Sequence, residues 1–309
     1  DIEEWVKGSE TSITNGSVYV VEFWATWCAP CRKAIPHLTK LQDYYGDDEL
    51  KVIGVSTEEL DTVKTFVKRQ GERMNYTVAV DRRGATERAW TRAAKLDGIP
   101  AAFIIDRNGK IQFIGNPHDD EFDMTLDLVI NGRFDAKLAA ESKSQRESIR
   151  NARKMKNWRM ATRLMDDLID TDAYAFAPVA LSKFEMMLVD MNDQVGAYKY
   201  AEQLLEKYST DAWVLGRLAR TIATSPAIPD DKRDYQIALA AAKKAAEAGR
   251  ADADAYAVQA LVHFHAGHVD EAVALQKKAY FTARPQRKAT YKRTLESYQA
   301  ARARSGMGG

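Results

Sequence analysis

The chain has 309 residues, of which 45% are hydrophobic and 29% charged, and its formal net charge is +1. This length predicts two domains that each bury a core, and the balanced charge excludes the strongly positive field on which nucleic-acid-binding proteins depend. The two cysteines, Cys28 and Cys31, lie three positions apart. They therefore form a reactive pair or half of a metal site, not a bridge between distant segments.

In the first half of the chain, short β-rich runs alternate with segments of helical period, a pattern typical of a sheet wound with helices. Strands are predicted at 18–24, 51–56, 77–81, 101–105 and 110–114. Helices are predicted at 29–45, 58–70 and 84–94, followed by a helix with Phe122, Leu126, Val129 and Ile130 on one face. Asn108-Gly109 predicts a two-residue hairpin turn between the last two strands.

In the second half the strand pattern ends, and Ala, Leu, Lys, Glu and Arg recur with helical period. Ala238 and Ala272 lie 34 positions apart, which favours close packing of successive helices, and Gly267 suits a tight turn. This pattern resembles the tetratricopeptide repeat (TPR), in about four degenerate copies; the alternative is an ordinary helical bundle. We therefore predict an α/β domain over 1–135 and an all-α helical-repeat, TPR-like domain over 136–309.

The cysteine pair lies where a buried strand turns into a helix. A thiol at a helix N-terminus meets unpaired backbone N–H groups and the positive end of the helix dipole, and both lower its pKa. We therefore expect Cys28 to be the exposed nucleophile and Cys31, nearly one turn later and facing inward, to be the resolving thiol. Pro30 costs the helix little because the N–H that it lacks has no partner in the first turn.

Residues 18 to 130 resemble the thioredoxin fold, and more closely its TlpA-like bacterial branch. The motifs are Phe-Trp-Ala-x-Trp-Cys-x-x-Cys at 23–31, a proline at Pro36, and Gly98-Ile99-Pro100 before the hairpin. The resemblance implies an α/β thioredoxin-like N-terminal domain with a cis Ile99–Pro100 bond beside the cysteines; the alternative is an ordinary trans proline. A cis bond would turn the backbone of Ile99 outward to pair with an extended substrate chain.

The resemblance also implies that Trp27, Ala29 and Pro30 contact the substrate together with Ile99 and Pro100. Glu22 lies six positions before Cys28, where thioredoxins carry an acid, usually Asp. Burial would raise the pKa of Glu22, which would then take the proton from Cys31 during resolution. The alternative is an edge position whose carboxylate meets water.

Other kinds of site fit less well. A zinc site needs four ligands and the cysteines supply two, so we expect no metal and no cofactor. A peroxiredoxin would place Pro and Thr before a lone cysteine, and a copper-delivery relative would have three residues between its cysteines, whereas this chain has two. His263, His265 and His268 are expected to be satisfied or solvated, with at most His265 and His268 on one helix face.

These features predict a thiol-disulfide oxidoreductase. The resemblance further implies a disulfide reductase, because reducing members of the family often carry proline before the resolving cysteine, as Pro30 is here. Its partners would be protein disulfides or dithiols, a thiol protein as electron donor, and a protein docked on the helical repeats. In the alternative, the repeats are the working part of a scaffold or chaperone-like binding protein and the redox pair is regulatory. The resemblance implies an extracytoplasmic (periplasmic or membrane-facing) location. A first residue of Asp1 rather than Met leads us to expect that an upstream segment is missing, and a signal peptide, a lipid anchor or a tag all fit this expectation.

Overall fold

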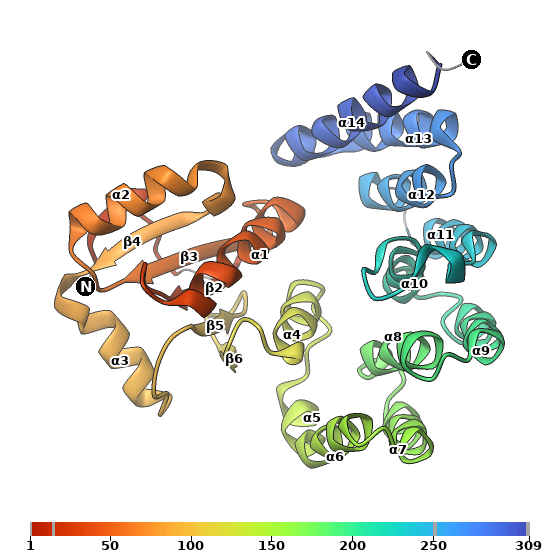
Figure 1. Cartoon of the computed structure of the whole chain (residues 1–309), viewed down its shortest axis with the longest axis horizontal. Coiled ribbons are helices and arrows are strands. Elements are labelled where there is room, and N and C mark those ends of the chain that lie inside the picture. Colours follow the sequence, from red (N-terminus) through yellow and green to blue (C-terminus); the bar gives the residue numbers. More distant parts are fainter. Residues whose placement is uncertain (1, 14–15, 250–251, 307–309) are drawn as a thin grey trace. The chain divides into compact units, whose positions relative to one another are not determined.

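The computed structural model of the protein describes residues 2–13, 16–249 and 252–306. The chain divides into two compact units, Asp1–Ala136 and Lys137–Gly309, which are labelled by element in Figure 1. Each unit has its own hydrophobic clusters, and each is described by itself.

The first unit is built on a six-stranded mixed sheet with the strand order β1-β4-β3-β2-β5-β6. The strands are β1 (Ile2–Lys7), β2 (Val18–Phe23), β3 (Leu50–Ser56), β4 (Thr77–Asp81), β5 (Ala101–Ile105) and β6 (Ile111–Gly115). Strands β2, β3 and β4 are parallel to one another, whereas β1, β5 and β6 pair antiparallel with their neighbours. The cysteine-bearing helix follows β2, so the sheet delivers the pair from a central strand.

Helices cover both faces of this sheet. They are α1 (Ala29–Tyr45), α2 (Leu60–Gln70), α3 (Ala85–Ala93) and α4 (Asp120–Ile130), with short 3₁₀ segments η1 (Gly71–Met74) and η2 (Arg82–Gly84). One core cluster joins α1, α2 and α4 to one face of the sheet, and a second cluster places Trp90 of α3 against the other face. Successive residues of β2 alternate between the two clusters, because side chains in a strand point to opposite faces in turn.

One strand of this unit was missed in the sequence and one predicted turn was wrong. Strand β1 was not predicted; it pairs with β4 at the edge of the sheet, with Glu3 exposed and its other residues half-buried. The β5–β6 turn is not a two-residue turn, because Gly109 alone of the Asn108-Gly109 pair takes a positive φ. Instead the Gly109 N–H donates to the Asp106 carbonyl (3.0 Å) and the Asp106 N–H donates to the Lys110 carbonyl (2.9 Å), which makes a three-residue loop.

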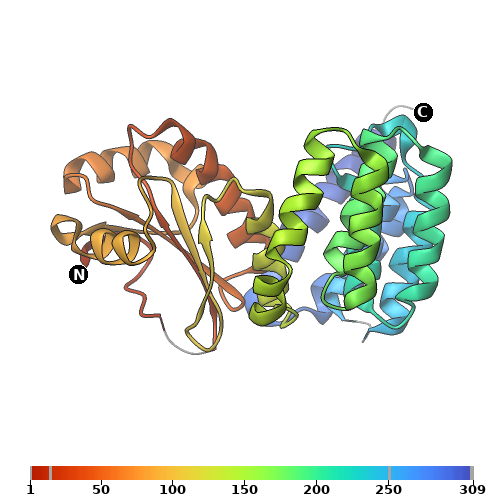
Figure 2. The same ribbon diagram turned by 90° about the horizontal axis from the view of Figure 1, so that it is seen from below.

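The second unit is entirely helical within its described residues, and the helices drawn in green to teal lie side by side in Figure 2. The α-helices are α5 (Ala136–Glu141), α6 (Lys143–Lys154), α7 (Trp158–Thr171), α8 (Ala177–Glu185), α9 (Gln194–Lys207), α10 (Ala212–Thr224), α11 (Tyr235–Ala248), α12 (Ala253–His265), α13 (Val269–Thr282) and α14 (Lys288–Gly306). The π segment η3 (Met186–Asp190) and the 3₁₀ segments η4 (Asp230–Lys232) and η5 (Pro285–Arg287) complete it. An α/β unit followed by an all-α unit is the predicted fold class.

Small residues allow these helices to approach closely. Ala238 on α11 and Ala272 on α13 are fully buried, and Gly267 takes a positive φ between α12 and α13. One expectation here was wrong: the rings of His263 and His268 lie together, with centroids 5.5 Å apart. The helix ends before His268, whose N–H donates back to the His263 carbonyl (2.8 Å), so a continuous-helix projection does not apply.

Candidate active site

The two cysteines occupy the first turn of α1. Cys28 is the N-cap residue of this helix, and its Sγ accepts the backbone N–H of Cys31 at 3.2 Å. The two sulfur atoms form a disulfide. Pro30 lies in the first turn, where its missing N–H leaves no bond unmade. The sulfur of Cys28 therefore lies against the backbone N–H groups of a helix start, which favour a thiolate there after reduction.

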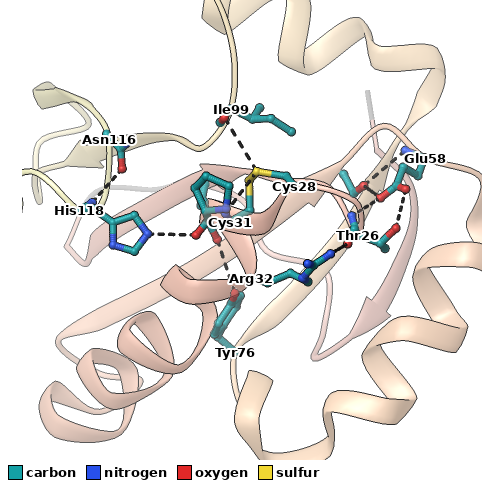
Figure 3. The surroundings of a disulfide bond; sticks show 12 residues. Thr26, Cys28, Cys31, Arg32, Glu58, Tyr76, Ile99, Asn116 and His118 are labelled. Atoms are coloured by element: carbon teal, nitrogen blue, oxygen red, sulfur yellow. Dashed lines mark hydrogen bonds between the residues drawn. A yellow bond between two sulfur atoms is a disulfide. The ribbon is translucent and has the colours of Figure 1, made fainter.

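The disulfide is covered, contrary to the expectation of an exposed Cys28. Cys28 is 4% exposed and Cys31 is fully buried. The N-cap position turns the Cys28 sulfur toward the helix, and the Ile99 carbonyl oxygen lies 3.9 Å from it on the other side (Figure 3). The neighbouring Trp27 side chain is 70% exposed, and Ala29 and Pro30 are also exposed. These exposed residues and the Ile99 carbonyl therefore border the disulfide.

The Ile99–Pro100 segment has the predicted arrangement. Its peptide bond is cis, Pro100 is buried and Ile99 is half-buried. The Ile99 carbonyl oxygen faces Cys28, so this segment and the start of α1 form the two sides of the site (Figure 3).

A carboxylate that the sequence analysis did not identify holds the loop before Cys28. Glu58 accepts the Thr26 N–H at 2.6 Å through one oxygen and the Thr26 hydroxyl at 2.7 Å through the other. Arg32 on α1 donates to the Thr26 carbonyl at 2.8 Å. Glu58 comes just after β3, and the parallel pairing of β2 with β3 brings the ends of these strands together. That adjacency was the available sign of its role.

His118 is a second residue that the sequence analysis did not place at the site. Its Nε2 lies 3.0 Å from the carbonyl oxygen of Pro30, a residue that lies between the two cysteines in the sequence. A carbonyl oxygen only accepts hydrogen bonds, so Nε2 must carry the hydrogen. The loop between β6 and α4 supplies this histidine, whose N–H donates to the Asn116 side chain at 2.9 Å (Figure 3).

Glu22 is buried in the middle of the sheet and not at an edge. It lies on β2 between Gly54 of β3 and Ala102 of β5 and has no exposed surface. Strand alternation places it on the face where α1 packs, because Val20 of β2 and Trp24, which directly follows β2, share a cluster with Cys31. Burial raises the pKa of Glu22 to about 8, and a hydrogen bond from Tyr76 opposes this shift. Glu22 therefore keeps its proton at neutral pH in this disulfide form.

No arrangement suited to a metal ion is found among the described residues, in which no group of three or more His, Cys, Asp or Glu side chains converges. Likewise, none of the helices in the described part of the chain is both long and apolar enough to cross a bilayer.

Known proteins that are similar to this chain match its first unit. Residues 3–114 match the model of the AhpC/TSA family. This match lies within the first unit, which has a thioredoxin-like fold. Protein FixW of Rhizobium leguminosarum is 28% identical over 37% of this chain and 56% of its own length. Thiol-disulfide oxidoreductase ResA of Bacillus thuringiensis subsp. konkukian is 31% identical over 31% of this chain and 53% of its own length.

A crystal structure of a thiol-disulfide isomerase from Corynebacterium glutamicum is 26% identical, with a TM-score of 0.36, over 42% of this chain and 92% of that one. The chain spans just over half the length of the two curated relatives named above.

Proposed function

We propose that this protein is a thiol-disulfide oxidoreductase that works as a disulfide reductase, with Cys28 as nucleophile and Cys31 as resolving thiol. The observation that carries the proposal is the disulfide in the first turn of α1, where Cys28 Sγ accepts the Cys31 N–H. A relative is named a thiol-disulfide oxidoreductase, which supports the reaction class but not its direction.

The reaction transfers two electrons by exchange. The Cys28 thiolate attacks a substrate disulfide, a Cys28–substrate bond forms, and the first substrate sulfur leaves and takes a proton from solvent. Cys31 then gives its proton to the Glu22 carboxylate and attacks Cys28 Sγ. The Cys28–Cys31 bond forms, the second substrate sulfur leaves, and the substrate is reduced. An electron-donor dithiol protein restores the thiols by the reverse steps.

Glu22 suits this proton transfer because its raised pKa lets it hold a proton near neutral pH. In the disulfide form its pKa of about 8 keeps the proton that Cys31 has released. When a donor reopens the disulfide, the same proton is available to the buried Cys31 sulfur, for which a thiolate in an apolar cluster is unfavourable. The carboxyl therefore acts as a base in one direction and as an acid in the other.

Substrate contact is proposed for the residues around the covered disulfide. Trp27, Ala29 and Pro30 expose surface on one side, and the Ile99 carbonyl with the adjacent Pro100 forms the other. An extended substrate strand would pair with the Ile99 backbone while its sulfur reaches Cys28.

The helical unit is proposed to be a TPR-like array, over 136–309, that docks a protein partner, while the redox domain occupies 1–135. Its stacked helices with buried alanines at the predicted spacing support this assignment. We also propose an extracytoplasmic location, with a membrane anchor upstream, which the resemblance to the TlpA-like branch supports.

The test is to trap the intermediate. Cys31→Ser should leave client proteins covalently attached to Cys28, and Cys28→Ser, the matched control, should trap none. Wild-type protein should reduce insulin disulfides with a thiol donor, and both variants should fail. Equal trapping by both variants, or insulin reduction that survives Cys28→Ser, would refute the mechanism. If Cys28→Ser still binds the natural partner but reduces nothing, the scaffold alternative is supported. Equilibration in glutathione buffers decides the direction: a potential near −120 mV, roughly that of a strong oxidant, contradicts the reductase assignment.

A further inference from the structure

The surroundings of the Glu22 carboxyl contain little that can hydrogen-bond to it. Its neighbours across the sheet, Gly54 and Ala102, have no polar side chain. Glu22 Oε1 is buried and has no hydrogen-bond partner among the described residues. The Tyr76 hydroxyl donates to Oε2 at 3.5 Å. Apart from burial, this bond is the one influence of a described residue on the pKa of Glu22.

Tyr76 reaches this carboxyl because Gly54 has no side chain. A Cβ added at Gly54 would lie 3.0 Å from Cε2 of the Tyr76 ring and 3.0 Å from the Trp24 indole nitrogen. Any larger residue at position 54 would therefore push the tyrosine ring aside. Tyr76 precedes β4 and is 5% exposed, and its hydroxyl points toward the start of α1 (Figure 3).

The Tyr76 hydroxyl is a donor that does not ionise. Burial and the adjacent Glu22 raise the pKa of Tyr76 well above its usual value, so its proton remains in place. A permanent donor stabilises a carboxylate more than it stabilises a neutral carboxyl group. The other titratable groups packed on this face are Cys28 and Cys31 of α1, once the disulfide opens, and the Tyr45–Asp127 pair, while β3 and β5 present Gly54 and Ala102.

We propose that Tyr76 is a positioning residue for Glu22: its hydroxyl holds the carboxyl and favours the charged form that accepts the Cys31 proton. The proposal rests on the proposed function and adds a residue to it. Without the hydroxyl, Glu22 would remain protonated to a higher pH and would be a carboxylate less often when Cys31 must be deprotonated.

The experiment is an infrared titration of the oxidised full-length protein. The C=O stretch of the protonated Glu22 carboxyl is identified by its loss in Glu22→Gln. Tyr76→Phe removes only the hydroxyl and should move the midpoint upward by about 0.5 to 1 pH unit, because one hydrogen bond to the charged form is lost. Tyr45→Phe is the matched control, since the Tyr45 hydroxyl also donates to a buried carboxylate, Asp127, at 2.7 Å. That variant should leave the midpoint unchanged.

A kinetic measurement complements the titration. The low-pH limb of the kcat profile for insulin reduction should move to higher pH in Tyr76→Phe, and the change should vanish in the Glu22→Gln background. An unchanged Glu22 midpoint in Tyr76→Phe overturns the inference, even if the enzyme is fully active. Because the titration needs no substrate, it answers the question even if the proposed reductase activity is absent. If Tyr76→Phe does not fold, 3-fluorotyrosine at position 76 gives a stronger donor, and the midpoint must then move downward.

Discussion

Glu22 should make the stability of the first unit depend on pH with a sign opposite to that of most carboxylates. Its pKa rises from an ordinary 4.5 to about 8 in the folded protein. Below pH 4.5 Glu22 is protonated in both the folded and the unfolded chain, so its contribution to the free energy of unfolding is fully present. Between pH 4.5 and 8 only the unfolded chain releases it, and the free energy of unfolding falls by about 1.4 kcal/mol per pH unit.

The perturbation is Glu22→Gln, which keeps the size of the side chain but does not titrate. From the two pKa values, the loss in wild type reaches about 3 kcal/mol at pH 7 and about 5 kcal/mol above pH 8. The stability difference between variant and wild type should therefore grow in favour of the glutamine from pH 5 to pH 8. Any constant offset from the amide cancels in this comparison.

Hydrogen exchange of the β2 and β3 backbone amides in the oxidised protein measures this difference at the relevant strands. Protection factors are compared at pH 5, 6, 7 and 8 after correction for the intrinsic exchange rates. Glu72→Gln, at an exposed position on η1, is the matched control and should give parallel curves. If Glu22→Gln also gives a curve parallel to wild type, the folded-state pKa is ordinary and the proton-holding role of Glu22 is wrong.

The remaining predictions concern other parts of the chain. Glu58→Gln turns an amide group toward one of the two Thr26 donors, so exchange protection of the loop before α1 should fall by about 1 to 3 kcal/mol; unchanged protection would show that the pair does not hold the loop. Ala272→Leu overfills a fully buried position and should cost about 1 to 3 kcal/mol in denaturant unfolding of the helical unit, whereas Ala274→Leu, on the exposed side of the same helix, should cost little. Asp234→Ala removes the side-chain cap of α11 and should cost about 1 kcal/mol by the same measurement, with Asp234→Asn close to wild type.

The local sequence pattern was enough to predict elements with a strong hydrophobic signal. The strand at 77–81 and the helix at 29–45 have the predicted bounds, because a continuous apolar run and a 3.6-residue period leave few alternatives. Strand β1 carries two glutamates and a lysine in six residues, so hydrophobic pattern alone does not distinguish it from a loop. Its structure depends on pairing with the edge of β4, which no local pattern records.

The site divides in the same way. Cys28 and Cys31 were identified because they are the two cysteines of the chain and lie three positions apart. Glu22 was identified because it is an acidic residue within an apolar strand. Glu58 and Tyr76 could not be identified in this way, since each lies 32 or more positions from its partner and reaches it only through the sheet. The burial of Cys28 was missed although Ile99 was expected beside the cysteines, because a helix N-terminus by itself does not show how closely a segment 71 positions away approaches the sulfur.

The two sulfurs of the disulfide have unequal surroundings, and this inequality orders the chemistry. Negative charge on Cys28 is stabilised by the backbone N–H of Cys31 at the helix start. Negative charge on Cys31 would form in a fully buried apolar cluster, where desolvation opposes it. An incoming thiolate that bonds to Cys28 and expels Cys31 therefore needs a proton for the leaving sulfur, and the protonated Glu22 on the same face of the sheet can provide it. Attack at Cys31 would instead expel Cys28, which needs no such proton, so loss of the Glu22 carboxyl should slow only the first of these two routes.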